Sequence, residues 1–219
     1  MTKPLTLIVG ISGTGKSTSL RNLMPGETIV FNTENKALPF KHNLKIVNIT
    51  DDNPHLMTTL IRQLKDPKHD HYKIVVIDSL TKWTQQLLVH SENNLTDKKD
   101  YYKPYRDIKK YIYDFFELCK STDKQFFITA RDDISTLHTG QTTRTVKVEG
   151  GAWKGGECEA EATIVLYTNV VREMGKSNFY FETQSDGATT AKSPMGMFDE
   201  FMIPNDLNFV NTKIEEYYS

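Results

Sequence analysis

The sequence is poor in cysteine and has no long apolar run. Its two cysteines, Cys119 and Cys158, lie far apart, and neither belongs to a Cys-x-x-Cys motif. This excludes a disulfide framework and a zinc site of the usual spacing, and it suits a reducing compartment. No apolar run approaches the length of a membrane-spanning helix, and no signal peptide precedes the first strand-like segment. We therefore expect a cytoplasmic protein that does not contact a membrane.

An excess of charge of one sign is also missing. The chain has 27 Lys and Arg against 28 Asp and Glu, which gives a net charge of −1. This balance argues against a globally basic coat, so binding to a polyanion would have to use local patches. A chain of 219 residues with 38% hydrophobic content can bury one α/β core, and we find no linker or internal repeat. We expect one domain over residues 1–219.

The most informative motif present is G-x-x-x-x-G-K-[ST] at Gly10–Ser17, between the apolar run Leu5–Val9 and a helix-compatible stretch. In such a phosphate-binding loop the glycines let backbone N–H groups turn toward the phosphates. Lys16 then reaches the β- and γ-phosphate oxygens, and the Ser17 hydroxyl ligates Mg²⁺. The alternative is a glycine turn that binds nothing, but no packing reason demands Lys16 and Ser17 together. The expected nucleotide-binding residues of this segment are Gly10, Ile11, Ser12, Gly13, Thr14, Gly15, Lys16, Ser17 and Thr18.

Strand-like and helix-like segments alternate along the first 130 residues. Continuous apolar runs are typical of strands that are covered on both faces, as in a parallel sheet. We expect strands at Leu5–Val9, Thr28–Phe31, Lys45–Ile49, Ile74–Asp78 and Gln125–Ala130, and helices at Lys16–Met24, from Pro54, at Leu80–His90 and at Tyr105–Lys120. Further on we expect a loop or β-hairpin at Thr136–Thr145, antiparallel strands at Ala162–Tyr167 and Asn178–Glu182, and a short helix within Asn205–Ser219. The predicted fold class is α/β, a P-loop NTPase with a mostly parallel sheet flanked by helices and antiparallel strands added in the C-terminal half.

Two acids follow strands of this predicted sheet. Asp78 ends the run Ile74–Ile77, where a P-loop fold needs a carboxylate for the magnesium ion. The alternative for Asp78 is an N-cap of the helix that follows. Glu34 lies at the carboxyl end of the second strand, where ligands gather in open α/β sheets, so it could orient the attacking water. Its alternative is a solvated loop acid.

With these residues the chain resembles the RecA-like ATPase family, and more closely the phage-encoded RecA-like core ATPases of single-strand annealing, the Sak type, which are often labelled phage nucleotide-binding or AAA ATPases. The resemblance covers roughly residues 5–170 and is carried by Gly10–Ser17, Ile29–Glu34, Ile77–Ser79 and Phe126–Ala130. It implies Mg²⁺-dependent ATP hydrolysis, with Glu34 activating water. It also implies that Thr129 or Arg131 senses the γ-phosphate and that Phe40 contacts adenine.

The same resemblance implies two loops that bind single-stranded DNA, at residues 91–104 and 132–156. The expected DNA-binding residues are Lys98, Lys99, Tyr101, Tyr102 and Lys103 in the first loop, and Arg144, Lys147 and Trp153 in the second. Lysines interleaved with tyrosines suit phosphate neutralisation and base stacking, whereas Asp97 and Asp100 dilute the charge. The alternatives are a solvated loop without a ligand and a tryptophan that only packs. The resemblance further implies a homo-oligomer in which Lys192 or Lys176 reaches a neighbour's γ-phosphate, and a phage recombination or single-strand-binding protein as a partner in the host cytoplasm.

Two other functions stay open on the sequence. A P-loop nucleotide or small-molecule kinase would need a lid with several arginines, but only Arg172 follows Arg144. A nucleotide-gated scaffold would bind ATP with little turnover. The segment His69–His71 precedes a strand and follows Pro67, so we interpret it as a loop rather than a metal site.

Overall fold

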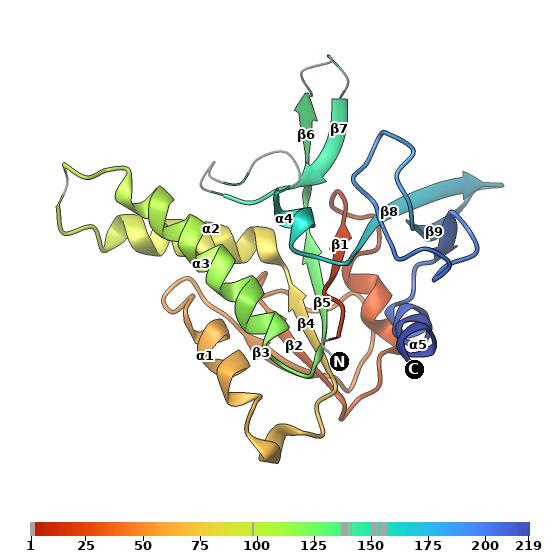
Figure 1. Ribbon diagram of the computed structural model, residues 1–219, viewed down its shortest axis with the longest axis horizontal. Coiled ribbons are helices and arrows are strands. Elements are labelled where there is room, and N and C mark those ends of the chain that lie inside the picture. The colour runs from red at the N-terminus through yellow and green to blue at the C-terminus, as the bar shows by residue number, and fades with distance from the viewer. Residues whose placement is uncertain (1–2, 98, 137–139, 141, 150–152, 154–156) are drawn as a thin grey trace.

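The computed structural model describes the chain except for residues 1–2, 98, 137–139, 141, 150–152 and 154–156. Its centre is an eight-stranded sheet with the strand order β10-β9-β8-β1-β5-β4-β2-β3 (Figure 1). The strands are β1 (Thr6–Val9), β2 (Thr28–Asn32), β3 (Lys45–Asn48), β4 (Ile74–Asp78), β5 (Gln125–Ala130), β8 (Ile164–Glu173), β9 (Lys176–Glu182) and β10 (Met202–Pro204).

The sheet is mostly parallel, as predicted, and its antiparallel part lies at one edge. β1, β2, β3, β4, β5 and β8 pair in parallel, whereas β9 pairs antiparallel with β8, and β10 antiparallel with β9. The expectation that Ala162–Tyr167 adds an antiparallel strand is wrong, because β8 runs parallel to β1 with Thr6 opposite Ile164. The first half of β8 is buried on both faces like the inner parallel strands, and the chain reverses only at the turn between β8 and β9.

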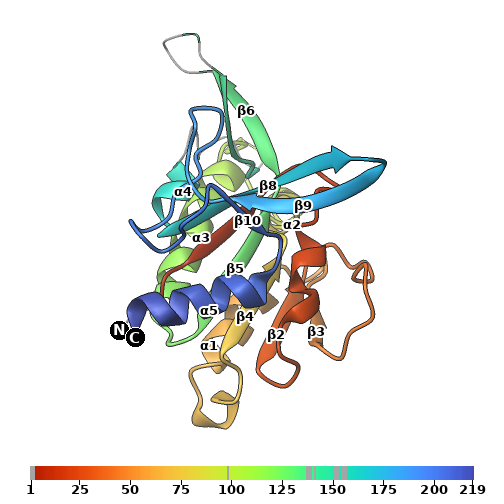
Figure 2. The ribbon, with the colours of Figure 1, turned by 90° about the vertical axis from the view of Figure 1, so that its right-hand side faces the viewer.

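Helices cover both faces of the sheet. On one face lie α1 (Leu56–Gln63), α2 (Leu80–Asn93) and α3 (Lys103–Lys120), and on the other lie η1 (Ser17–Asn22), a 3₁₀ helix, and α5 (Leu207–Tyr218) (Figure 2). Successive strand residues alternate between the two cores, so that Leu7 packs in the core of α1 to α3 and Ile8 in the core of η1 and α5. This burial on both faces explains the continuous apolar runs. Two short elements lie outside these layers, α4 (Glu157–Ala160) and η2 (Pro67–His69).

Two further expectations change in detail. The helix expected over Lys16–Met24 is a six-residue 3₁₀ helix, η1, in which the Ser19 hydroxyl donates to the Lys16 carbonyl at 2.6 Å and Pro25 follows soon after the last turn. The segment expected as a loop or hairpin forms β6 (Asp132–Thr136) and β7 (Thr142–Val146), an antiparallel pair that projects away from the main sheet (Figure 1). No helix among the described residues is long and apolar enough to cross a membrane.

Candidate nucleotide-binding site

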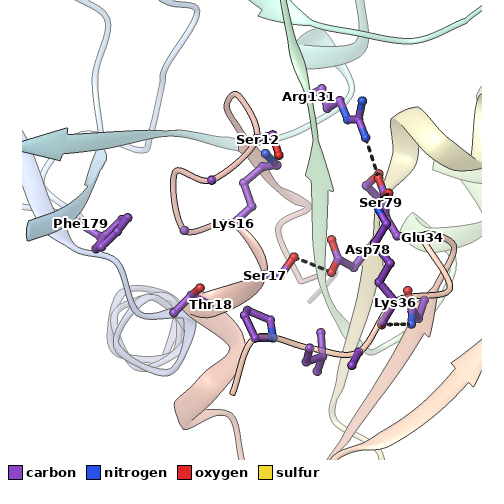
Figure 3. Close-up of a pocket in the computed structure, with 16 residues that line it drawn as sticks. Ser12, Lys16, Ser17, Thr18, Glu34, Lys36, Asp78, Ser79, Arg131 and Phe179 are labelled. Carbon is purple, nitrogen blue, oxygen red and sulfur yellow. Dashed lines mark hydrogen bonds and ion pairs between the residues drawn. The ribbon is translucent and has the colours of Figure 1, made fainter. Parts of the chain in front are cut away.

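A cavity of about 300 Å³ opens at the carboxyl ends of β1, β2, β4 and β5. Ligands gather at this edge of open α/β sheets, because the loops that follow neighbouring parallel strands meet there. Figure 3 shows the phosphate-binding loop on one side of the cavity and Glu34, Asp78 and Arg131 on the other. The structure therefore brings together the residues that the sequence predicts for phosphate binding and hydrolysis.

The backbone of the phosphate-binding loop depends on its glycines. Gly13 and Gly15 have φ angles of +82° and +95°, in the left-handed region that favours glycine. Gly10 is constrained by space instead, since a Cβ there would lie 1.8 Å from the Thr168 hydroxyl of β8. That hydroxyl also lies 2.6 Å from the Thr14 hydroxyl, so β8 supports the loop from behind.

Lys16 folds back over the loop that carries it. Its Nζ donates to the carbonyl oxygens of Gly10 at 2.6 Å and Ile11 at 2.7 Å. Burial lowers the pKa of the Lys16 ammonium, and the nearby Asp78 carboxylate opposes this shift. The charge thus lies inside the cavity, on carbonyl partners that phosphate oxygens could replace.

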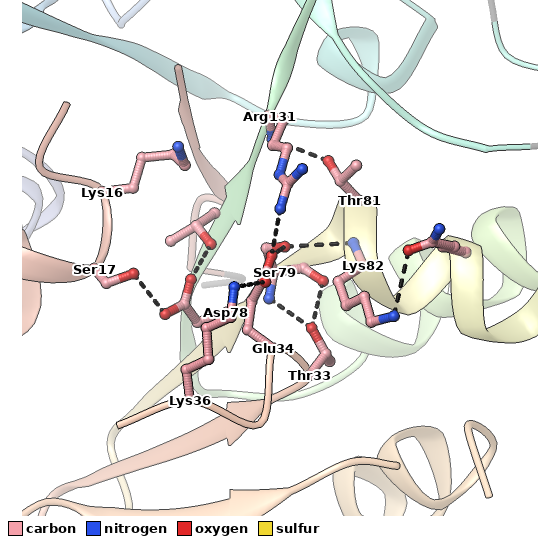
Figure 4. A network of polar contacts seen from close by, with 12 residues as sticks. Lys16, Ser17, Thr33, Glu34, Lys36, Asp78, Ser79, Thr81, Lys82 and Arg131 are labelled. Carbon is pink, nitrogen blue, oxygen red and sulfur yellow. Dashed lines mark hydrogen bonds and ion pairs between the residues drawn. The ribbon is translucent and has the colours of Figure 1, made fainter. Parts of the chain in front are cut away.

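Asp78 ends β4 and is fixed by a hydrogen bond to each carboxylate oxygen. The Ser17 hydroxyl donates to Oδ2 at 2.8 Å, and the Thr129 hydroxyl donates to Oδ1 at 2.6 Å (Figure 4). Ser79, rather than Asp78, caps α2, because its hydroxyl accepts from the Lys82 amide. A hydroxyl and a carboxylate side by side are the hard oxygen ligands that Mg²⁺ prefers.

Glu34 follows β2 and faces the same cavity with its side chain 21% exposed. Its Oε1 accepts from the Ser79 hydroxyl and from Arg131 Nη2, both at 3.3 Å, and its Oε2 accepts from Lys36 at 3.4 Å (Figure 4). Three donors from different segments hold the carboxylate in place. This arrangement favours a positioned acid over a solvated loop residue.

The candidates for sensing the γ-phosphate and for contacting the base lie in different surroundings. Thr129 is fully buried, and its hydroxyl donates a hydrogen bond to Asp78, whereas Arg131 lines the cavity. Phe40 does not line the cavity; it packs against the core of η1 and α5, while Leu38 and Pro39 line the wall.

An aromatic residue that the sequence reasoning missed, Phe179 of β9, also lines the cavity. It shares a face of β9 with the buried Phe181, yet it is 40% exposed. A large apolar side chain left uncovered on a strand is the signal that could have found it, but only once β9 is known to lie near the phosphate-binding loop.

The first expected DNA-binding loop forms the tip of the arm made by α2 and α3 (Figure 1). Tyr101 and Tyr102 are each 60% exposed, with ring centroids 4.2 Å apart. Lys99 is exposed, and Lys103 pairs with Asp107 of α3. Lys98 lies outside the described residues.

The second expected DNA-binding loop is less suited to its role. Arg144 forms an ion pair with Asp132 at 2.6 Å and lies 5.2 Å above the Tyr167 ring. Its guanidinium therefore already has partners within the protein, which makes it less suited to bind DNA phosphates. Trp153 packs against Phe116 at 6.1 Å between ring centroids, as the packing alternative predicts. Lys147 is half-buried, and residues 150–152 and 154–156 of this loop lie outside the described part of the chain.

Of the two lysines expected to act on a neighbouring subunit, Lys176 is exposed beside the turn between β8 and β9. Lys192 is half-buried beside β8, where its backbone pairs with Val165, and burial lowers its pKa. Among the residues that the structure describes, no three His, Cys, Asp or Glu side chains come together as metal ligands. The loop expected at His69–His71 is partly wrong, because His69 is the last residue of η2.

A family model described as an AAA domain matches residues 2–195. No curated protein matches the chain. Among solved structures, the KaiC-like protein PH0186 from the hyperthermophilic archaea Pyrococcus horikoshii OT3 is 16% identical, with 81% of this chain and 76% of that chain covered and a TM-score of 0.48.

Proposed function

The chain belongs to the AAA domain family, whose model matches residues 2–195, and we propose that it binds ATP with Mg²⁺ and hydrolyses the bond to the γ-phosphate. The observation that carries this proposal is the placement of two acids from separate strands around one phosphate-binding loop. Asp78 lies 2.8 Å from the Ser17 hydroxyl, and Glu34 faces the same cavity.

In this proposal the residues around the cavity have separate roles in hydrolysis. Loop amides and Lys16 neutralise the phosphates, while Ser17 and Asp78 supply the oxygen atoms for Mg²⁺. Glu34 accepts a proton from a water molecule while the oxygen of that water molecule bonds to the γ-phosphorus. The bond between the γ-phosphorus and the bridging oxygen breaks, and ADP is released. Arg131, which pairs with Glu34 at 3.3 Å, is our candidate for sensing the γ-phosphate.

A kinase is less well supported. A kinase lid needs several arginines around the transferred phosphate, but Arg131 is the one arginine among the described residues that line the cavity. Transfer of phosphate to a nucleoside monophosphate would reverse this conclusion.

We further propose that the arm tip binds single-stranded DNA in phage recombination or replication. Tyr101 and Tyr102, an exposed pair of neighbouring rings tilted by 37°, offer faces for bases, and Lys99 offers a charge for phosphates. A recombination or single-strand-binding protein fits as a partner in this role, and a homo-oligomer would let Lys176 reach a neighbouring site from its exposed hairpin. Specific activity that rises with protein concentration, and that falls in Lys176→Ala, is the expected sign of such an assembly.

Fluorescence anisotropy with a labelled oligothymidine tests the DNA proposal, with ATP present and across a range of salt. We expect salt-dependent binding that weakens about tenfold or more in the double variant Tyr101→Ala/Tyr102→Ala, because stacking contributes about 1–3 kcal/mol per base. The matched control is Tyr217→Ala/Tyr218→Ala, which removes the exposed ring pair at the end of α5. Absence of binding at low ionic strength would favour the nucleotide-gated scaffold.

A further inference from the structure

A second group of residues lies beside the phosphate-binding loop, and one of them, Phe179, lines the cavity. The ring of Phe179 and the side-chain amide of Asn205 come together over Gly15, where an added Cβ would lie 3.1 Å from Phe179 Cδ1 and 3.1 Å from Asn205 Oδ1. Phe179 lines the cavity together with Thr18 at the start of η1 (Figure 3). Lys16 and Ser17 line the same cavity, so a nucleotide whose phosphates they bind would extend past Thr18 toward Phe179.

Asn205 is buried without a partner for its side-chain amide. The residue is 2% exposed, and among the described residues neither Oδ1 nor Nδ2 has a hydrogen-bond partner. A buried amide that stays unpaired destabilises the protein, because no hydrogen bond replaces the ones it lost to water. The cost is offset if a bound ligand supplies the missing donor and acceptor.

The backbone around Asn205 is fixed to the phosphate-binding segment. Arg21 of η1 donates to the Asn205 carbonyl at 2.6 Å, and Asn22 donates to Asp206 at 2.5 Å. The amide is therefore held at a constant place relative to the loop that binds the triphosphate. Asn205 itself lies between β10 and α5, next to η1.

We propose that Phe179 and Asn205 form a nucleobase subsite that selects adenine, a proposal that rests on ATP being the substrate. Phe179 stacks on the base, and its partial exposure leaves room for the ring to turn aside and uncover the amide. The amide presents one donor and one acceptor side by side, which match N7 and the N6 amino group of adenine. Guanine offers two acceptors at the same edge and leaves the Asn205 oxygen unpaired.

The test compares equilibrium binding of ATP, GTP and inorganic tripolyphosphate in the presence of Mg²⁺, measured by calorimetry. Wild type should bind ATP more tightly than GTP and than tripolyphosphate. In Phe179→Ala we expect ATP to bind about tenfold more weakly, because a stacked base is lost, and tripolyphosphate to bind unchanged. Phe201→Ala is the matched control, since Phe201 is 44% exposed and does not line the cavity.

For Asn205, two variants separate base recognition from support of the loop. Asn205→Leu removes both polar groups, and Asn205→Asp keeps the shape but removes the donor; both should lower the ratio of ATP to GTP affinity about tenfold. Tripolyphosphate affinity should stay at the wild-type value in whichever variant keeps the wild-type unfolding midpoint. Equal weakening of ATP and tripolyphosphate, or an unchanged ATP preference, would overturn the subsite. If the wild type bound none of the three ligands, the proposed ATPase function itself would fail.

Discussion

At the scale of single residues, the orientation of Asp78 is set before any metal arrives. Ser17 approaches one carboxylate oxygen from the phosphate-binding loop, and Thr129 approaches the other from the neighbouring strand β5. Partners of this kind hold a metal ligand in the geometry that binding needs, and their loss typically weakens metal affinity or activity about 10- to 100-fold. We therefore expect Thr129 to act through Asp78 and not by touching the nucleotide.

The substitution Thr129→Val tests this role. We expect the Mg²⁺ concentration for half-maximal ATP hydrolysis to rise about tenfold, because the freed carboxylate oxygen can turn away from the metal. The control is Thr28→Val on β2, whose buried hydroxyl has no hydrogen-bond partner among the described residues. A variant with the magnesium dependence of wild type would show that Thr129 does not position Asp78.

A second prediction at this scale concerns pH. Burial lowers the pKa of Lys16 from the ordinary value of 10.5, so the free protein loses this charge at a lower pH than an exposed lysine would. Bound phosphates favour the ammonium form. ATP affinity should therefore be fully present below the lowered pKa and fall as the pH rises through it, by about tenfold per pH unit.

Titration of the ATP dissociation constant over alkaline pH checks this expectation. In Lys16→Arg the guanidinium stays protonated over this range, so the decline should disappear even if overall affinity is lower. Circular dichroism over the same range controls for unfolding. A flat profile in the wild type would contradict the assignment of Lys16 as the phosphate-binding cation.

At the scale of elements, the phosphate-binding loop is shaped by β8 and β9 as well as by its own strand. Thr168 of β8 fills the space beside Gly10 and contacts the Thr14 hydroxyl, while Phe179 of β9 reaches Gly15. The antiparallel edge of the sheet thus forms part of the nucleotide site.

The energetic effect of this contact can be measured by comparing Gly10→Ala with the double variant Gly10→Ala/Thr168→Ala. The single variant should lower the free energy of unfolding by about 1–3 kcal/mol, since its Cβ collides with the Thr168 hydroxyl. Removing that hydroxyl should restore part of the loss, because the remaining Thr168 Cβ lies 3.2 Å away, and Thr168→Ala alone is the control. Urea denaturation gives the three values; additive effects without coupling would argue against the contact.

The elements differ in how far the sequence could predict them. β4 and β5 match their expected bounds, because continuous runs of β-branched and aromatic residues are typical of parallel strands that are buried on both faces. The direction of β8 was predicted wrongly, since an apolar run does not reveal which strand it will pair with. β10 was missed because three residues at a sheet edge show no periodicity.

The same limit applies to the candidate site. Lys16, Ser17, Glu34 and Asp78 could be proposed because each follows a recognisable strand and so must lie at one edge of the sheet. Phe179 could not be, because its place depends on how the chain folds back after β8.

At the scale of the whole molecule, α2 joins the two proposed functions. Its N-cap residue, Ser79, donates to Glu34 at 3.3 Å, and its far end leads to the arm tip with Tyr101 and Tyr102 (Figure 1). A helix is stiff along its axis, so we expect DNA that binds at the tip to affect Glu34, the proposed catalytic acid, through α2. Stimulation of ATP turnover by single-stranded DNA is the behaviour that this arrangement leads us to expect.

The most direct measurement of the central claim is release of phosphate from bound ATP by Glu34→Gln in a single turnover. The variant should bind ATP with the affinity of the wild type. It should release phosphate at least about 10²-fold more slowly, because the amide cannot take the proton of the attacking water. Glu27→Gln, at the exposed residue just before β2, should behave as wild type. Release at the wild-type rate from Glu34→Gln would contradict the account.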